Sequence, residues 1–432
     1  MKILTCAIQL GTSRIMAVAA WKNTETGTLE NIEIESENAK GCISHGCISN
    51  VEQTAMHIKS IMQKLGNRMR TTISAAYVGI GGISLHSLIQ LPSVQIPGYD
   101  VLQAEPISGG QHQLIVGEKR LRQGVVAAME RAGIKLHNVI VLPQCSARIL
   151  TETERQRGCV LVDMGAGTTT VSIYKNGDLQ HMAVIPLGGN TVTSDIQSNG
   201  CSEEEAERNK IEWSNASEDS AEVAAAAQQA AANAVFAEKA LSMSQETLNT
   251  IVICRYEEIA ANILHQINNT GLKNNLSAGV ILTGGAAMQN GITSLMSKRL
   301  DINRVEVRAY AERAFVGSEH KPHLTNLLAM LNFCTEDCMT PVVKTSVPAT
   351  PATAKPVTTT TAATKPAVPT APSATEPAAA NKTQSSQLTL DIPQPDPEPE
   401  PEIKDPTMEA PKSSTLLRGL KHFLGDLVSG QN

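Results

Sequence analysis

A short stretch near the middle of the chain combines residue types that can hold a phosphate group. The apolar run 159–162 predicts a buried strand, residues 163–169 predict a tight turn, and the largely β-branched run 170–174 predicts a second strand. Glycines in the turn let successive backbone N–H groups point at one anion, while threonine hydroxyls and the Asp163 carboxylate add further polar contacts. The candidate phosphate-binding residues are Gly165, Ala166, Gly167, Thr168 and Thr169. An ordinary hairpin turn rich in small residues is the alternative interpretation.

Two other stretches have related patterns. Residues 3–18 also read as strand, turn and strand, and the residues of that turn are Gly11, Thr12 and Ser13. Residues 279–287 form an apolar strand that ends in a double glycine, where a flat adenosine group can lie against bare backbone. The candidate residues for that contact are Gly284, Gly285 and Ala286.

The order of these three motifs over about residues 1–335 resembles that of the actin, Hsp70 and sugar-kinase superfamily. Within it the chain is most similar to FtsA, an actin-like family of bacterial cell division proteins. The likeness is carried by residues 150–155, 184–196 and 279–287. The resemblance implies an α/β protein with a two-lobed actin-like ATPase fold, a shortened inserted subdomain, a disordered C-terminal linker and a terminal amphipathic helix.

The resemblance also implies ligands and roles for particular residues. ATP is expected between the lobes with Mg²⁺ near Asp163. Glu207 and Lys210 lie three residues apart on a helix predicted at residues 203–212 and match the acid and lysine that contact ribose and adenine in the family. A solvated ion pair is the alternative for these two. Residues 143–154 predict a helix that links the lobes. Gln144 near its start is a candidate for orienting the attacking water, with helix capping or packing as the alternative.

One departure from the family pattern concerns catalysis. The superfamily usually has an acidic residue two positions before the first glycine turn, and this chain has Gln9 there. A neutral amide can bond a metal-bound water but supplies no charge to the metal. Val171 also replaces an aspartate that related proteins often have. We therefore expect nucleotide binding with weak or absent ATPase activity, and we place Gln9, Asp163 and Gln144 as the candidate catalytic residues.

Composition excludes several functional classes. The 432 residues carry a net charge of -6 and only 3% aromatic residues, which argues against nucleic-acid binding. We find no signal peptide and no apolar run long enough to span a membrane, so we expect a cytoplasmic location. The nine cysteines have irregular spacings that fit reduced thiols better than metal ligands.

Changes in composition suggest the domain organisation. We expect a first lobe at 1–157 with an inserted subdomain at about 84–142, which is short because residues 98–110 read as a loop. A second lobe follows at 158–338, with a peripheral subdomain at about 200–277. Residues 339–412 are rich in proline, threonine, alanine and acidic side chains and predict a disordered tether.

The last segment, residues 413–432, predicts an amphipathic helix. Its large apolar residues fall on one helical stripe and its basic residues lie off it. Such a helix suits the boundary of an anionic membrane; docking on the protein's own body or on a partner is the alternative. The candidate membrane-binding residues are Leu416, Leu417, Arg418, Leu420, Lys421, Phe423, Leu424 and Leu427.

By resemblance, the protein is an ATP-binding cell division protein that tethers FtsZ filaments to the inner face of the cytoplasmic membrane and helps assemble the septum machinery. The expected partners are the C-terminal peptide of FtsZ, bound near Arg255, other copies of the chain, the membrane surface and other division proteins. The alternative function is a small-molecule kinase or phosphatase of the same superfamily. Such an enzyme would have no use for a tethered amphipathic helix.

Overall fold

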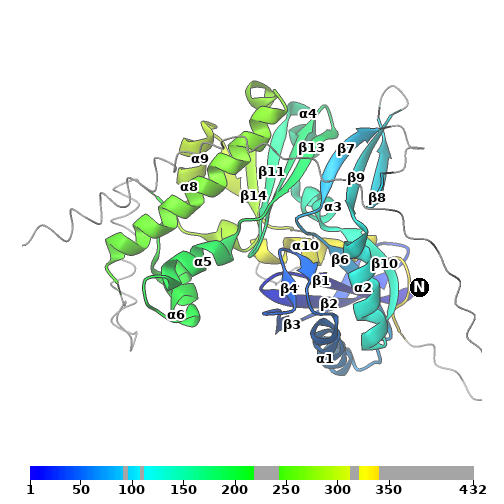
Figure 1. Ribbon diagram of the computed structural model, residues 1–432. Helices are drawn as coiled ribbons and strands as arrows, with labels where there is room; N and C mark the ends of the chain where they lie inside the picture. The colour runs from blue at the N-terminus through cyan, green and yellow to red at the C-terminus, as the bar shows by residue number, and fades with distance from the viewer. Residues whose placement is uncertain (91–95, 108–110, 218–242, 312–320, 340–432) are drawn as a thin grey trace, which may run out of the picture. The chain divides into compact units, whose positions relative to one another are not determined.

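The computed structural model describes residues 1–90, 96–107, 111–217, 243–311 and 321–339. The predicted tether from residue 340 onward and the predicted amphipathic helix lie outside the described residues. The described ranges belong to one compact unit, residues 1–347. Its mixed α/β architecture confirms the predicted fold class (Figure 1).

A five-stranded sheet with the order β10-β6-β1-β2-β3 contains the first glycine turn. Strands β1 and β2 form an antiparallel hairpin, and β6 joins β1 in parallel. Helices α1 and α2 contact each other beside this sheet (Figure 1). The bounds are β1 Lys2–Leu10, β2 Arg14–Asn23, β3 Leu29–Asn38, β6 Ala75–Ile80, β10 Lys135–Val141, α1 Val51–Met69 and α2 Lys119–Ala132, with the small hairpin β4 Ile43–Ser44 and β5 Cys47–Ile48.

An eight-stranded sheet with the order β15-β14-β11-β12-β13-β7-β9-β8 contains the second glycine turn. Helices α5, α8 and α9 pack with it around a second hydrophobic core. The strand bounds are β7 His86–Gln90, β8 Tyr99–Pro106, β9 His112–Glu118, β11 Cys159–Met164, β12 Thr169–Lys175, β13 Asp178–Ile185, β14 Gly279–Thr283 and β15 Val305–Val307. The helix bounds are α5 Gly189–Gln197, α6 Glu203–Arg208, α8 Gln245–Asn269, α9 Ile292–Leu300 and α10 Thr325–Met330.

The loop predicted at 98–110 is wrong over most of its length, because β8 occupies Tyr99–Pro106 and pairs antiparallel with β9. The flanking glycines and prolines are typical of a loop, and β8 has no fully buried side chain of its own. The buried side chains of this strand pair come from β9. Within the range expected for an inserted subdomain, β7, β9 and β8 extend the second sheet, whereas α2 packs on α1 and β10 is an edge of the first sheet.

The single helix predicted at 143–154 is also wrong. The structure has α3 Leu142–Ser146, a 3₁₀ turn at Ala147–Ile149 and then α4 Glu152–Arg157. Leu150 is extended, and Thr151 begins a new helix through a capping box with Glu154. Similarly, the helix predicted at 203–212 changes after Arg208 into a π-helical turn, Asn209–Trp213.

Short 3₁₀ turns complete the described elements at Lys273–Asn275, Ala286–Met288, Pro322–Leu324 and Leu331–Phe333. Among the described helices, none combines the length and the apolar character needed to cross a bilayer.

Candidate functional site

The two glycine turns meet at their tips. In the first turn Gly11 N donates to Arg14 O at 3.1 Å, and in the second Gly165 N donates to Thr168 O at 2.8 Å. A Cβ at Gly167 would lie only 2.6 Å from Thr12 Oγ1, so only a glycine lets the turns approach this closely. The structure thus brings together two predicted phosphate turns that are more than 150 residues apart in the sequence.

The second turn is also fixed by the N-terminus of α5. Gly189 N donates to Gly165 O at 3.0 Å and Asn190 N donates to Ala166 O at 2.7 Å. A Cβ at Gly188 would lie 2.6 Å from both of those carbonyl oxygens. We did not assign these residues to the site from the sequence; the signal available was a double glycine directly after a strand.

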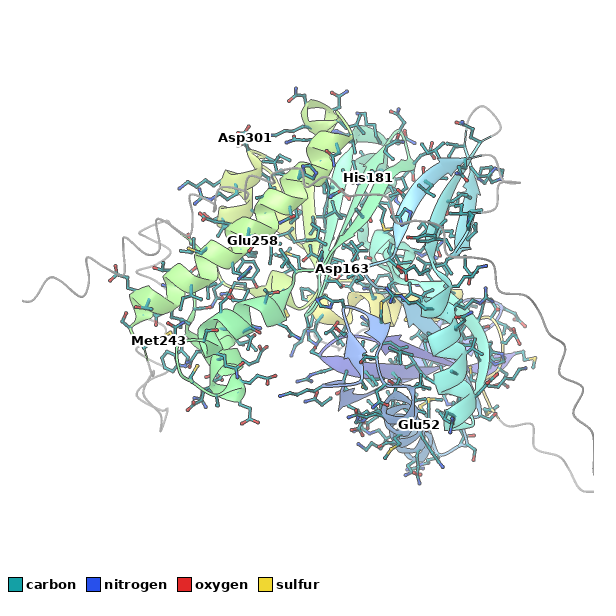
Figure 2. All side chains as sticks on the ribbon, viewed as in Figure 1. Glu52, Asp163, His181, Met243, Glu258 and Asp301 are labelled. Atoms are coloured by element: carbon teal, nitrogen blue, oxygen red, sulfur yellow. The ribbon has the colours of Figure 1, made fainter. Side chains whose placement is uncertain are left out.

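Asp163, the candidate metal residue, lies at the end of β11 (Figure 2). Asn326 Nδ2 donates to Asp163 Oδ2 at 2.6 Å, and a Cβ at Gly284 would lie 2.5 Å from Asp163 Oδ1. Burial raises the pKa of the Asp163 carboxyl group, while the bond from Asn326 acts in the opposite direction. Asn326 was missed from the sequence because it comes from α10, 163 residues further along.

Two amide oxygens of the candidate site, one on the first hairpin and one on α10, have no hydrogen-bond donor among the described residues. Gln9 Oε1 and Asn326 Oδ1 are both buried and accept no hydrogen bond in the structure. Gln9 stands two residues before Gly11, as Asp163 stands two residues before Gly165. Because a buried acceptor without a donor costs free energy, these oxygens fit a ligand that donates hydrogen bonds, such as metal-bound water.

Lys210 is buried in a compact cluster with Thr193 of α5 and with Glu207, whose side chain is 45% exposed. Lys210 Nζ lies 2.6 Å from Glu207 Oε2, 2.8 Å from Thr193 Oγ1 and 3.1 Å from Gly189 O. Burial lowers the pKa of Lys210, although the Glu207 carboxylate opposes the shift. The lysine is only 7% exposed. The i,i+3 ion pair of the alternative interpretation is present, but its lysine is buried and not solvated.

The double glycine after β14 lies beside this cluster. Gly284 has a positive φ of 91°. Gly189 lies close to Ala286, since a Cβ at Gly189 would be 3.5 Å from the Ala286 methyl group. Tyr256 of α8 donates its hydroxyl to Ala286 O at 3.1 Å and so fixes the 3₁₀ turn. Gly285 is exposed.

The remaining candidate residues differ in their exposure and in the hydrogen bonds that their side chains already make. Ser13 is exposed, and Thr168 and Gln144 are partly exposed. The Thr169 hydroxyl is buried and donates to Leu187 O at 2.8 Å, so the fold itself uses that group. Arg255 makes two hydrogen bonds to the Asp195 carboxylate, at 2.5 and 2.9 Å, and contacts Glu258. An acidic partner would have to compete with these groups.

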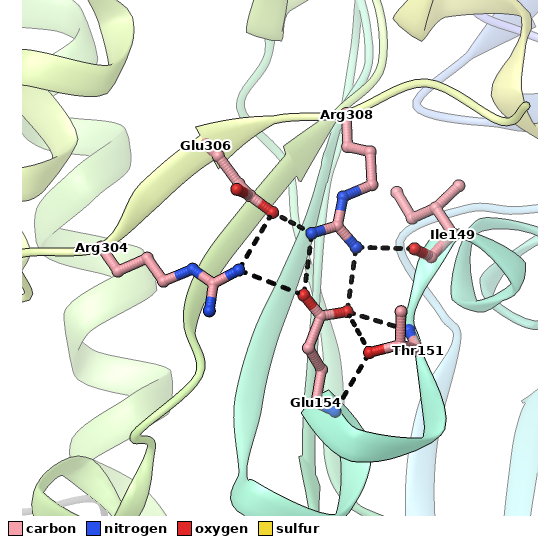
Figure 3. Close-up of polar contacts among 6 residues, drawn as sticks. All are labelled: Ile149, Thr151, Glu154, Arg304, Glu306 and Arg308. Carbon is pink, nitrogen blue, oxygen red and sulfur yellow. Dashed lines mark hydrogen bonds and ion pairs between the residues drawn. The ribbon is translucent and has the colours of Figure 1, made fainter.

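A charged network anchors the segment that leads into β11 (Figure 3). Glu154 accepts from Arg308 Nη1 at 2.9 Å and Nη2 at 2.8 Å, and from Thr151 N at 2.9 Å. Arg308 also donates to Ile149 O at 2.8 Å and contacts Glu306. The pKa of Glu154 falls to about 2, mainly because Arg308 bonds its carboxylate. The network joins α4 to the strand β15.

No group of three or more histidine, cysteine, aspartate or glutamate side chains in the described ranges could enclose a metal ion. A metal at Asp163 would therefore rely on one carboxylate, amide oxygens and water. Such a set suits Mg²⁺, which keeps several water ligands when it binds with a nucleotide.

Comparisons with known proteins find related cell division proteins. A family model described as "Cell division protein FtsA" matches residues 160–356. A cell division protein FtsA of Porphyromonas gingivalis is 29% identical over 69% of this chain and 71% of its own length. The FtsA of Bacillus subtilis is 30% identical over 50% of this chain and 47% of its own length.

Solved structures show the same fold at low sequence identity. The PilM-PilN type IV pilus biogenesis complex matches with a TM-score of 0.53 and 16% identity, covering 76% of this chain and 97% of the other. MreB5 of Spiroplasma citri, solved bound to ADP, matches with a TM-score of 0.50 and 13% identity, covering 77% of this chain and 96% of the other.

Proposed function

We propose that this chain, which belongs to the FtsA family of actin-like cell division proteins, binds ATP between its two glycine turns and links division filaments to a membrane. The single observation that supports the nucleotide part is the close approach of Gly167 to Thr12, which would let one ligand contact both turns. The MreB5 structure, which has the same fold, was solved bound to ADP, and this supports nucleotide binding by the present chain.

The chain's own residues supply binding and orientation. Backbone N–H groups of the turns would hold the phosphates, and the Gly284 to Ala286 backbone would face the adenosine. Lys210 and Glu207 would contact the ribose and adenine, with Thr193 holding both side chains in place. The bound Mg²⁺ would neutralise phosphate charge, and its water ligands would face Asp163, Gln9 and Asn326.

Slow turnover follows from the same residues. Gln9 cannot accept a proton from water or add negative charge beside the metal, and Asp163 is occupied by Asn326. Gln144 is partly exposed and is the remaining candidate for orienting a water. The expected behaviour is a nucleotide-dependent conformation, with hydrolysis weak or absent.

The membrane and partner functions rest on other parts of the chain. The stripe from Leu416 to Leu427, with Arg418 and Lys421 beside it, would insert at the surface of an anionic bilayer on the cytoplasmic side. Several copies in a filament would bind firmly through avidity. The acidic C-terminal peptide of FtsZ would bind at Arg255 by displacing Asp195, whose carboxylate accepts two hydrogen bonds from this arginine.

Co-sedimentation of the full chain with anionic vesicles and FtsZ filaments tests this proposal. With ATP present, the protein should carry FtsZ into the vesicle pellet, and a variant ending at residue 415 should leave FtsZ in the supernatant. The tethering role would be overturned if the full chain and the truncated variant carried equal amounts of FtsZ into the pellet, or if neither carried any. Leu416→Gln with Leu420→Gln provides a control that changes only the apolar stripe.

A further inference from the structure

Asn326 is the polar residue of α10 that reaches into the site. Its side chain is 6% exposed, and Nδ2 donates to Asp163 Oδ2 at 2.6 Å. The next residues of α10, Leu327 and Leu328, pack into the core of the first sheet. Asn326 therefore joins the second glycine turn to a helix that is held by the other lobe.

The same helix is fixed at its far end. Lys22 of β2 donates to Leu331 O at 3.0 Å, Asn332 O at 3.3 Å and Cys334 O at 2.8 Å, just after α10. At the near end, Thr325 Oγ1 accepts from Thr283 Oγ1 at 2.9 Å. Because both ends are bonded, the Asn326 amide has little freedom to move away from Asp163.

The other half of the Asn326 amide points to a ligand. Nδ2 is used by Asp163, but Oδ1 is buried and has no donor. Gln9 Oε1 is likewise buried without a donor, and Gln9 occupies the position in the first hairpin that Asp163 occupies in the second. Gln9 stands before the first turn, and Asn326 bonds Asp163 before the second. The two turns approach each other at Thr12 and Gly167. The two orphaned amide oxygens and this carboxylate therefore make a set that accepts hydrogen bonds and carries a single negative charge.

We propose that Asn326 is a positioning residue for the metal–nucleotide complex: its Nδ2 holds Asp163, while its Oδ1 and Gln9 Oε1 accept hydrogen bonds from the metal's water ligands. This inference rests on the proposed nucleotide binding and adds a residue from a third element to it. Asp163 is the single charged group among these three side chains, so they attract a divalent cation weakly. Mg²⁺ should strengthen ATP binding only modestly in this protein.

The test measures ATP affinity of the full chain in EDTA and in millimolar Mg²⁺, and takes the ratio of the two dissociation constants. Asn326→Asp places a second carboxylate beside Asp163, so binding in EDTA should weaken and the ratio should rise by about tenfold. Asn326→Leu removes both amide groups at similar volume, and the ratio should fall toward one.

A merely structural role would weaken ATP binding equally with and without the metal. Asn332→Leu is the matched control, because its amide lies on the same segment but bonds the Tyr310 hydroxyl instead. If Asn326→Asp fails to fold by circular dichroism, Gln9→Glu carries the same test and should also raise the ratio.

Wild-type ratios in both Asn326 variants, within about twofold, would overturn the inference while leaving nucleotide binding intact. No ATP binding by the wild-type chain under either condition would overturn the proposed function, and this inference with it.

Discussion

Replacing Glu154 by glutamine should destabilise the protein by breaking the network that anchors the segment before β11. The carboxylate side chain is 8% exposed and is bonded by both terminal nitrogens of Arg308 and by Thr151. Its pKa of about 2 compares with an ordinary value of 4.5. At 1.36 kcal/mol per pKa unit, this difference stabilises the fold by about 3 kcal/mol at neutral pH.

The sign gives a specific pH dependence. Since the folded pKa lies below the unfolded value, the stabilisation is complete above about pH 4.5 and is lost as the pH falls toward about 2. Glu154→Gln lacks the ionisable group. The difference in unfolding free energy between wild type and variant should therefore shrink as the solution is acidified.

Urea unfolding of the full chain at neutral pH and at several acid pH values measures this difference. Glu152→Gln is the matched control, because Glu152 is exposed on the same helix and accepts a hydrogen bond from Gln156. Its effect should stay below about 0.5 kcal/mol. An effect of Glu154→Gln no larger than the control, or one that does not change with pH, would refute the reasoning.

Three further predictions concern the site. Gly167→Ala places a methyl group 2.6 Å from Thr12 Oγ1 and should weaken ATP binding by about tenfold or more, whereas Gly124→Ala in α2 meets only ordinary contacts and should not; isothermal calorimetry distinguishes them. Lys210→Met keeps the volume but leaves Glu207 without its cation, so ATP affinity should fall by at least about tenfold, and unchanged affinity would remove Lys210 from the site. Thr169→Val removes the hydrogen bond to Leu187 O and should lower the unfolding free energy by about 1 kcal/mol with ATP affinity unchanged. A large loss of affinity without destabilisation would instead make that hydroxyl a ligand group.

The sequence carried the parts of the site that depend on local patterns. Each hairpin is encoded within about 15 residues by apolar strands and a glycine turn, so residues 3–18 and 158–174 could be located without a structure. Lys210 and Glu207 could be paired because a helix sets their spacing. The family motif at residues 150–155 could be recognised from the sequence, including the Thr151 and Glu154 spacing of a capping box. The ion pair of Glu154 could not be predicted, because its partner Arg308 is distant in the sequence.

The missing parts depend on contacts between distant segments. Asn326 looked like any polar residue before an apolar run, and only the packing of α10 brings it to Asp163. Strand β8 has few buried residues of its own and is defined by its pairing with β9. The break at Leu150 arises because Thr151 forms a better cap than a continuing helix would allow.

Hydrogen exchange of the full chain with and without ATP tests the central claim most directly. The account predicts that ATP slows exchange together in the peptides covering residues 9–14, 163–169 and 284–288, and that Gly167→Ala abolishes this protection. Protection confined to one turn, or no change in any of the three at saturating ATP, would contradict a nucleotide site shared by the two hairpins.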